Sequence, residues 1–318
     1  MTVDPGPGDL LGPRRALVAI DGSTASDVAI DLVGSLPWPE GSSIRVIECL
    51  DMGPGLYGGP WPALALTQSD ELETALRAEA HHEIDDARER LAGPGRSISG
   101  AVEFGRPASV IVEEAHNMSA DLVVVGSRGH GRLATMVLGS TSAEVVDHAP
   151  APVLVARGTR IERIVLAWDG SPVAERAVDA VRHWPILQAA ETRVVVVADV
   201  GTAWWTGFAD VGASVSPEQA TIAVEAARAT LAEAERMADD VVRVLREAGR
   251  TAEADVREGD PADAIIAAAQ DAGADLIVLG THGRTGLARL RMGSVASSVV
   301  RHAPCSVLVV RAPEAESA

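Results

Sequence analysis

Cysteine is nearly absent from the 318-residue chain, which contains only Cys49 and Cys305. The two residues fall in different halves of the sequence, each in an apolar run typical of a β-strand. Free cysteines in such runs are usually buried and behave as small apolar side chains. We therefore expect two buried thiols, no disulfide and no metal site built from protein side chains.

Positive charge is also scarce, because 27 Lys and Arg residues stand against 45 Asp and Glu residues, a formal net charge of −18. Such a surface repels polyanions and acidic lipid headgroups, so nucleic acid and membranes are not expected as partners. No apolar run approaches the roughly 20 residues that span a bilayer. The first residues also lack the basic-then-apolar order of a signal peptide. These features together favour a cytoplasmic protein.

The sequence is an internal repeat of two halves. Residues Ala16 to Val33 match Ile164 to Val181, and "ADLVVVGSRGHGR" matches "ADLIVLGTHGRTG" further along. A chain of this length usually divides into two domains. We expect domains over residues 14–158 and 159–312, between a flexible tail of residues 1–13 and an acidic tail of residues 313–318. The join is too short for a flexible linker, so the domains should pack together.

Each half alternates short runs of Val, Ile and Leu with longer helical patterns, which is typical of a parallel sheet covered by helices on both faces. The class is therefore α/β, with five parallel strands in each domain. Long helices are expected at about Ser69 to Leu91 and Ser216 to Ala248. The expected strands are Ala16–Ile20, Ile44–Leu50, Ile98–Glu103, Leu122–Val125 and Val153–Ala156, then Ile164–Trp168, Val194–Ala198, Ala252–Arg257, Leu276–Leu279 and Val307–Val310.

A glycine pattern, G-x2-G-x9-G-[ST], follows the fourth strand of each half. Backbone N–H groups of a glycine loop and of the next helix N-terminus attract phosphate, and ligands of open α/β sheets lie at the carboxyl ends of the strands. An alternative is that these glycines only form turns and helix caps. The pattern consists of Gly126, Gly129, Gly139 and Ser140 in the first half and of Gly280, Gly283, Gly293 and Ser294 in the second.

An Asp-Gly-Ser sequence ends the first strand of each half, at Asp21 and at Asp169. A carboxylate at this position would repel phosphate, but it accepts hydrogen bonds from an adenine amino group or a ribose hydroxyl. We expect the base over the first strand and the phosphates over the fourth. The alternative is that each aspartate forms an Asx turn or a favourable charge at a helix N-terminus.

These motifs resemble those of the universal stress protein family, and the resemblance runs from about Arg15 to Arg311. It also rests on the turns at Gly105-Arg106-Pro107 and Gly259-Asp260-Pro261 and on the paired "HAP" segments at His148 and His302. The resemblance implies two Rossmann-like (adenine nucleotide alpha hydrolase-like) domains with strand order 3-2-1-4-5. It implies pairing of the domains through their fifth strands within the chain, with a homodimer as a further possibility. It also implies binding of ATP with Mg²⁺ and a regulatory role in stress response or growth arrest.

Carried onto this sequence, the resemblance makes Asp21 and Asp169 the adenosine anchors and brings the backbone near Cys49 and Val197 to the base. The glycines and the serines that follow them would hold the phosphates. Thr141 and Ser142 extend the row of hydroxyl groups in the first half. The second half has Val295 and Ala296 at those positions, so the two sites are not equivalent.

Other functions have less support in the sequence. The eight histidines are scattered, and the Walker pattern with its phosphate-binding lysine is absent, so we expect no catalysis beyond a slow ATPase. A protein-interaction module with a structural nucleotide is an alternative. Its binding anchors would be Tyr57 and Trp61 in one loop and Trp204, Trp205 and Phe208 in another. The favoured alternative for these side chains is that they cover the adenine pocket or fill the core. A flavin-dependent electron carrier shares only the fold class.

Overall fold

The structure is a computed structural model, and it describes residues 12–51, 62–127, 138–198, 216–281 and 292–311. The two halves form two α/β domains, as the sequence predicts. Their strands join into one ten-stranded sheet of order β3-β2-β1-β4-β5-β10-β9-β6-β7-β8. Counted within each domain, this is the order 3-2-1-4-5 that the resemblance implies.

All ten expected strands are present, with ends that differ from the expected bounds by at most three residues. The first domain contains β1 (Arg15–Ile20), β2 (Ser42–Leu50), β3 (Arg96–Phe104), β4 (Leu122–Gly126) and β5 (Val153–Ala156). The second contains β6 (Arg163–Ala167), β7 (Glu191–Ala198), β8 (Ala252–Glu258), β9 (Leu276–Gly280) and β10 (Ser306–Val310). Within each domain the paired strands are parallel.

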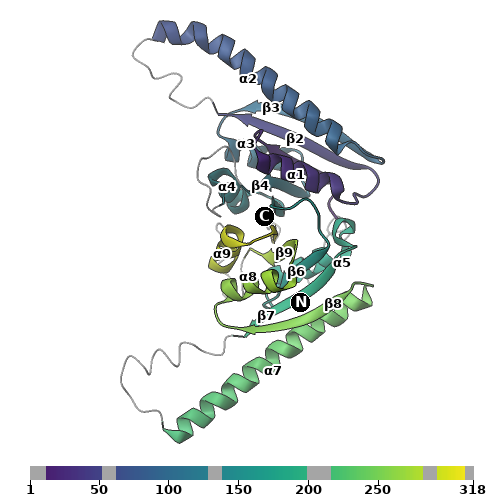
Figure 1. The fold of residues 1–318 in the computed structure, drawn as a ribbon, viewed down its shortest axis with the longest axis vertical. Coiled ribbons are helices and arrows are strands. Elements are labelled where there is room, and N and C mark those ends of the chain that lie inside the picture. Colours follow the sequence, from purple (N-terminus) through teal and green to yellow (C-terminus); the bar gives the residue numbers. More distant parts are fainter. Residues whose placement is uncertain (1–11, 52–61, 128–137, 199–215, 282–291, 312–318) are drawn as a thin grey trace, which may run out of the picture.

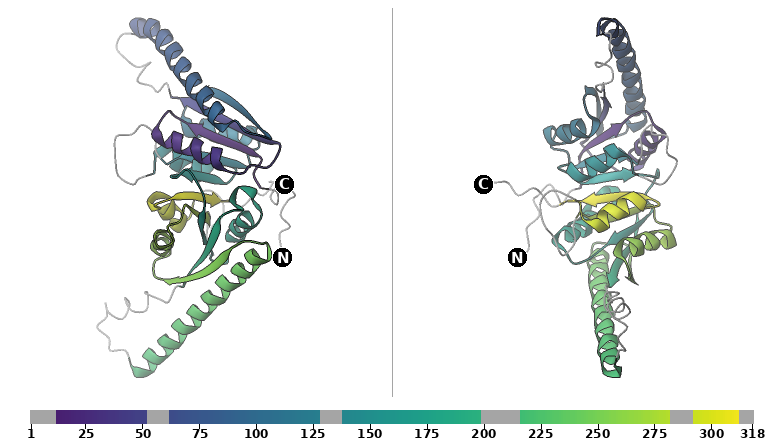
Figure 2. Two further views of the ribbon diagram at one scale, coloured as in Figure 1. Left: turned by 45° about the vertical axis from the view of Figure 1, so that its right-hand side comes forward. Right: turned by 90° about the vertical axis from the view of Figure 1, so that its left-hand side faces the viewer.

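Helices cover both faces of the sheet (Figures 1 and 2). One face carries α1 (Thr24–Ser35), α2 (Pro62–Leu91), α5 (Pro172–His183) and α7 (Pro217–Glu247), with the short 3-10 helix η1 (Pro185–Leu187). The other face carries α3 (Pro107–Asn117), α4 (Ser140–His148), α8 (Pro261–Ala272) and α9 (Ser294–His302). The long helices α2 and α7 extend beyond the sheet at opposite ends of the molecule (Figure 1).

Helix starts follow the local chemistry of the sequence. The Ser171 hydroxyl accepts from the N–H of Ala174 at the start of α5, and Ser216 forms a capping box with Gln219 at the start of α7. Helix α2, by contrast, begins at Pro62 and not near Ser69 as expected. Proline is favourable in the first turn of a helix, and the following Ala and Leu residues are strong helix formers, so the helix extends back to the end of the Gly- and Pro-rich stretch.

The two domains meet through their fifth strands, because β5 and β10 pair in antiparallel register with Leu154 opposite Leu308. The Arg157 guanidinium donates to the carbonyl oxygens of Val300, at 2.6 Å, and of Cys305, at 3.3 Å. Arg311 donates in the opposite direction, to the carbonyl of Val146. The domains therefore share both a continuous sheet and polar contacts.

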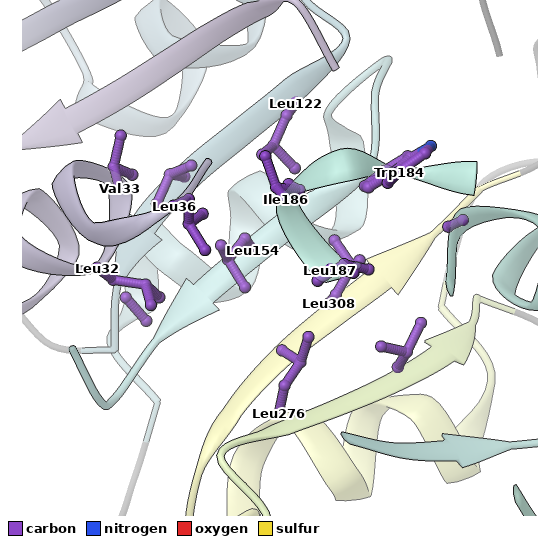
Figure 3. Packing of buried hydrophobic residues seen from close by; sticks show 14 of the residues in the cluster. Leu32, Val33, Leu36, Leu122, Leu154, Trp184, Ile186, Leu187, Leu276 and Leu308 are labelled. Atoms are coloured by element: carbon purple, nitrogen blue, oxygen red, sulfur yellow. The ribbon is translucent and has the colours of Figure 1, made fainter. Parts of the chain in front are cut away.

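Apolar packing continues across this join. Figure 3 shows Leu154 of β5 with Leu36, the residue that follows α1, on one side, and Leu187 beside Leu308 of β10 on the other. The same buried cluster contains residues of both domains. Gly12 and Pro13, which the sequence assigns to the flexible tail, are buried, and Gly12 lies against Trp184 and Pro185 of the second domain. Among the described residues, no helix is long and apolar enough to cross a membrane.

Candidate functional site

The predicted site residues meet at the carboxyl edge of the sheet, because the first and fourth strands of each domain are neighbours. In the first domain Ala19 of β1 pairs with Val125 of β4, so Asp21 and Ser127 follow the ends of adjacent strands. In the second domain β6 pairs with β9 in the same way, with Leu166 opposite Val278. Asp21 therefore lies beside the end of β4, and Asp169 lies beside the end of β9.

Asp21 is held in place by the turn that follows it. Gly22 has a φ of +69°, a left-handed conformation that glycine adopts without strain. The Asp21 Oδ1 atom accepts from the Ser23 N–H at 3.2 Å and from the Ser26 hydroxyl at 2.6 Å. The Asp21 N–H in turn donates to the Ser26 hydroxyl at 2.9 Å. The Asx-turn interpretation therefore describes these contacts correctly, and the turn fixes a half-buried carboxylate at the sheet edge.

Asp169 forms the same turn with fewer contacts. Gly170 has a φ of +77°, and the Ser171 N–H donates to the Asp169 Oδ1 atom at 3.0 Å. Ala174 occupies the position that Ser26 has in the first domain, so Asp169 has no hydroxyl donor there. The first-domain carboxylate is therefore more firmly oriented.

Gly126 and Gly280 are the last residues of β4 and β9. The sequence predicts both directly after these strands, so each strand is one residue longer than expected. Each glycine is required by close packing against the helix that follows the first strand. A Cβ atom at Gly126 would lie 2.8 Å from the Ala25 carbonyl oxygen, and one at Gly280 would lie 2.9 Å from the Val173 Cγ1 atom. The first glycine of each pattern therefore has a structural role, whatever ligand binds near it.

Gly139 and Gly293 are the cap residues of α4 and α9, as predicted. The N–H of Gly139 donates to the Ser127 carbonyl at 2.9 Å, and that of Gly293 donates to the Thr281 carbonyl at 2.7 Å. These bonds bring each helix start to the end of its fourth strand. Because a glycine cap has no side-chain acceptor, it leaves the N–H groups of the first helical turn without the capping that Ser23 supplies to α1.

The hydroxyl groups at the start of α4, which the sequence analysis treats as one row, lie in different surroundings. Ser140 is exposed at the start of α4 and Thr141 is half-buried. Ser142 is buried, and its hydroxyl donates to the Gly126 carbonyl oxygen at 2.7 Å. In this structure the hydroxyl proton of Ser142 therefore joins α4 to β4, which differs from the phosphate contact expected for it. In the second domain Ser294 is exposed, and Val295 packs against the core on that face of the sheet.

Several residues singled out in the sequence lie outside the described residues. They are the middle glycines Gly129 and Gly283 and the aromatic residues Tyr57, Trp61, Trp204, Trp205 and Phe208. Among the described residues, no group of three or more His, Cys, Asp and Glu side chains could hold a metal ion.

Cys49 and Val197 lie near the ends of the second strands, where the resemblance places backbone contacts to the base. Both are half-buried. Burial, followed by the charges of Glu103 and Glu48, raises the pKa of the Cys49 thiol to about 12, so it is protonated at neutral pH. The pKa of Cys305 is also raised to about 12, first by burial. Cys305 is buried and stands directly before β10, and both thiols are free.

Glu48 lies beside the candidate site, and the sequence interpretation did not include it. It is only 8% exposed, and it lies on β2 opposite Ile20, the residue before Asp21. Burial is the first cause that raises the pKa of Glu48 to about 8, followed by the charge of Glu83, a hydrogen bond to Glu83 and the charge of Asp21. A glutamate within the Val- and Ile-rich run "IRVIECL" is the signal that would have identified it. Val196 and Met237 take the places of Glu48 and Glu83 in the second domain.

Comparisons with known proteins match both halves of the chain to one family. A family model described as "Universal stress protein family" matches residues 13–157 and again residues 160–311. A universal stress protein of Mycolicibacterium smegmatis is 29% identical over 318 residues, covering 93% of this chain and 96% of that protein. One from Synechocystis is 42% identical over 154 residues, covering 46% of this chain and 99% of that protein.

Among solved structures, a universal stress protein from Archaeoglobus fulgidus superposes with a TM-score of 0.59 at 20% identity. The match covers 94% of this chain and 98% of that one. At this level of identity the likeness supports the tandem fold, and the chemistry of the two sites has to be argued from the residues of this chain.

Proposed function

The chain belongs to the universal stress protein family, and we propose that it is a regulator that binds ATP at two sites, one in each domain. The observation that carries this proposal is a juxtaposition repeated in both domains. An oriented aspartate ends the first strand, and a helix capped only by glycine begins beside the neighbouring fourth strand. The two ends of each site thus suit the two ends of a nucleotide.

The base and ribose end would lie at Asp21 and Asp169. A carboxylate accepts hydrogen bonds, and adenine N6 and the ribose hydroxyls are donors. The phosphates would lie at the starts of α4 and α9, where free N–H groups and the positive end of the helix dipole favour anions. The exposed hydroxyls of Ser140 and Ser294 stand at the first position of these helices and would add one donor each.

Charge balance favours ATP bound together with Mg²⁺. The chain contains no lysine, so arginine is its only strongly basic side chain, and the net charge is −18. A divalent cation carried by the triphosphate would offset part of the repulsion between ATP and this acidic protein.

A regulatory role fits better than catalysis. The Oδ1 atom of Asp21 is engaged by Ser23 and Ser26. Among the described residues, the one carboxyl with a strongly raised pKa is Glu48, and it lies on the face of the sheet opposite α4. Neither residue is therefore placed beside the proposed phosphates as a general base. We propose a cytoplasmic binding protein whose two occupied sites report nucleotide supply during stress or growth arrest.

The direct test is the number of nucleotides per chain. Purified protein is titrated with Mg·ATP by calorimetry, and the nucleotide released on denaturation is quantified by chromatography. We expect two equivalents for the wild type, one for Asp21→Ala and none for Asp21→Ala combined with Asp169→Ala. Glu191→Gln, an exposed change outside the sites, serves as the control and should retain two. A wild-type protein that binds no ATP would rule out the proposal and leave the fold unchanged.

A further inference from the structure

The helices beside the two sites are joined differently in the two domains. In the first domain Arg90 of α2 reaches across to α1. Its Nη1 atom lies 2.6 Å from Asp27 Oδ1, and its Nη2 atom lies 2.6 Å from Asp31 Oδ1. The two carboxylates lie one turn apart on α1 and hold the guanidinium between them. The hydrogen bonds that the guanidinium donates to both acids raise the pKa of Arg90. This arrangement joins α1 to α2.

The second domain keeps the acids but not the arginine. Glu175 and Asp179 of α5 correspond to Asp27 and Asp31, while Val244 of α7 corresponds to Arg90. The correspondence is secure because Leu91 and Leu245, the next residues of α2 and α7, are both fully buried.

The acids of α5 are therefore left without the cation that their counterparts have. Asp179 has His183 of its own helix as its ion-pair contact, at 4.0 Å. None of the ion pairs between described residues includes Glu175.

A groove of about 610 Å³ lies between α5 and α7 in place of the Arg90 bridge. Val178, Met237, Val241 and Val244 line it, together with Trp168 directly after β6. Val178 and Val241 are each only 6% exposed, so the accessible apolar surface comes from Met237, Val244 and Trp168. The three α7 residues follow the i, i+4, i+7 spacing of one helix face. The lining on α7 runs from Glu233 to Val244, about 16 Å at 1.5 Å per residue, which is three helical turns.

The rim of the groove is mainly acidic. Its carboxylates are Asp169, Glu175, Asp179, Glu233 and Asp240, and its cations are Arg182 and Arg243. Arg243 is already engaged, at 3.0 Å from Asp240 and 3.5 Å from Glu247. On α7, Glu233 and Asp240 are both paired with Arg236, so the rim acids of the two helices that have no arginine partner among the described residues are Glu175 and Asp179 on α5. A groove with one such acidic wall is complementary to a helix that is apolar along one face and basic along one edge.

We propose that this groove is a docking site for an amphipathic basic helix of a partner protein, which places an arginine between Glu175 and Asp179. The first domain shows this interaction within the chain, because Arg90 occupies the corresponding position. The partner helix supplies apolar side chains against Met237 and Val244 over about two turns. A second copy of this chain fits poorly, since its charge of −18 opposes approach to an acidic rim.

The probe is a synthetic 14-residue helical peptide with leucines along one face and arginines on one flank. A second peptide carries citrulline in place of each arginine and so keeps the shape without the charge. Binding of each labelled peptide to the full chain is followed by fluorescence anisotropy. We expect saturable binding of the arginine peptide, and about tenfold weaker binding of the citrulline peptide because the charge pairs are lost.

Two variants test the site in different ways. Glu175→Gln with Asp179→Asn removes the acid pair, and Val244→Arg supplies an arginine from α7 itself, as Arg90 does on α2. Each should weaken binding of the arginine peptide about tenfold. Glu225→Gln with Asp239→Asn removes the same charge outside the groove and should change the affinity less than about twofold.

Thermal melts confirm that the variants are folded, and the acid-pair variant keeps the test valid if Val244→Arg fails to fold. The proposal is overturned if the wild type shows no saturable binding, or if both groove variants bind as tightly as the wild type. It is also overturned, in favour of a second copy, if the wild type sediments as a dimer that Val244→Arg converts to a monomer.

Discussion

Glu48 of β2 and Glu83 of α2 bring two carboxyl groups together beside the turn that carries Asp21. A hydrogen bond between two carboxyl groups requires a proton on one of them. Glu83 also approaches the turn closely, since a Cβ atom on Gly22 would lie 2.3 Å from its Oε1 atom. The carboxyl pair therefore links the protonation of a buried residue to the packing of α2 and to the position of Asp21.

Stability should fall as the pH rises through the pKa of this pair. The pKa of Glu48 is raised from 4.5 to about 8 in the folded protein. The folded state therefore binds the extra proton between these values, and its contribution to stability is fully present below the unfolded pKa and lost above about pH 8. The groups facing Glu48 are Glu83 and Glu79 on α2 and Asp21 after β1. Because each pKa unit corresponds to about 1.4 kcal/mol, we expect a loss of up to about 5 kcal/mol across this range.

Thermal melting between pH 5 and pH 9 measures this loss, with Glu48→Gln as the matched variant. The glutamine keeps a hydrogen-bonding side chain and does not titrate, so the melting temperature of the variant should change less over this range. A variant with the same pH profile as the wild type would assign the dependence to other groups.

Arg90→Met should destabilise the first domain. Its guanidinium joins Asp27 and Asp31 of α1 to α2, and its removal leaves two like charges facing each other. Because the arginine bridges two carboxylates and is only partly exposed, we expect a loss of about 1–2 kcal/mol in the free energy of unfolding. Arg88→Met removes an exposed pair with Asp85 on the same helix and should cost less than about 0.5 kcal/mol. Urea denaturation of the two variants provides the comparison.

Gly126→Ala and Gly280→Ala should both destabilise the fold before any effect on ligand binding is considered. The added methyl group would meet the Ala25 carbonyl oxygen in one case and Val173 in the other, each closer than 3.0 Å. We expect a cost of about 1–3 kcal/mol for each, measured by thermal or chemical unfolding. Gly158→Ala is the control, because a Cβ atom there meets nothing within 4 Å. Equal stability of all three variants would contradict the packing role.

The neighbouring serines of α4 should separate stability from binding. Ser142→Ala removes a buried hydrogen bond to the Gly126 carbonyl and should cost about 1 kcal/mol of stability. Ser140→Ala changes an exposed hydroxyl at the proposed phosphate end, so it should weaken Mg·ATP binding several-fold and leave the melting temperature unchanged. Calorimetric titration and a thermal melt on each variant distinguish the two roles. A stability loss confined to Ser140→Ala would reverse the assignment.

The sequence by itself determined the architecture of this protein and the location of its candidate sites. The strands were recognisable because a parallel strand buried on both faces is a continuous run of Val, Ile and Leu, such as Leu122 to Val125. Helix starts at Ser171 and Ser216 were recognisable because capping depends on residues only three positions apart. The repeat then placed Asp169 and Gly293 once Asp21 and Gly139 had been identified.

Only the tertiary structure decided which side chains act together. Ser140 and Ser142 look alike in the sequence, but the helix turns one toward solvent and the other toward the Gly126 carbonyl. The pairing of Glu48 with Glu83 and the bridge from Arg90 to Asp31 join residues on different elements. The repeat pattern does not report such contacts, because they depend on how far apart the packed helices lie. The sequence shows that Val244 stands where the first repeat has Arg90. Only the structure shows that this difference leaves a groove between α5 and α7.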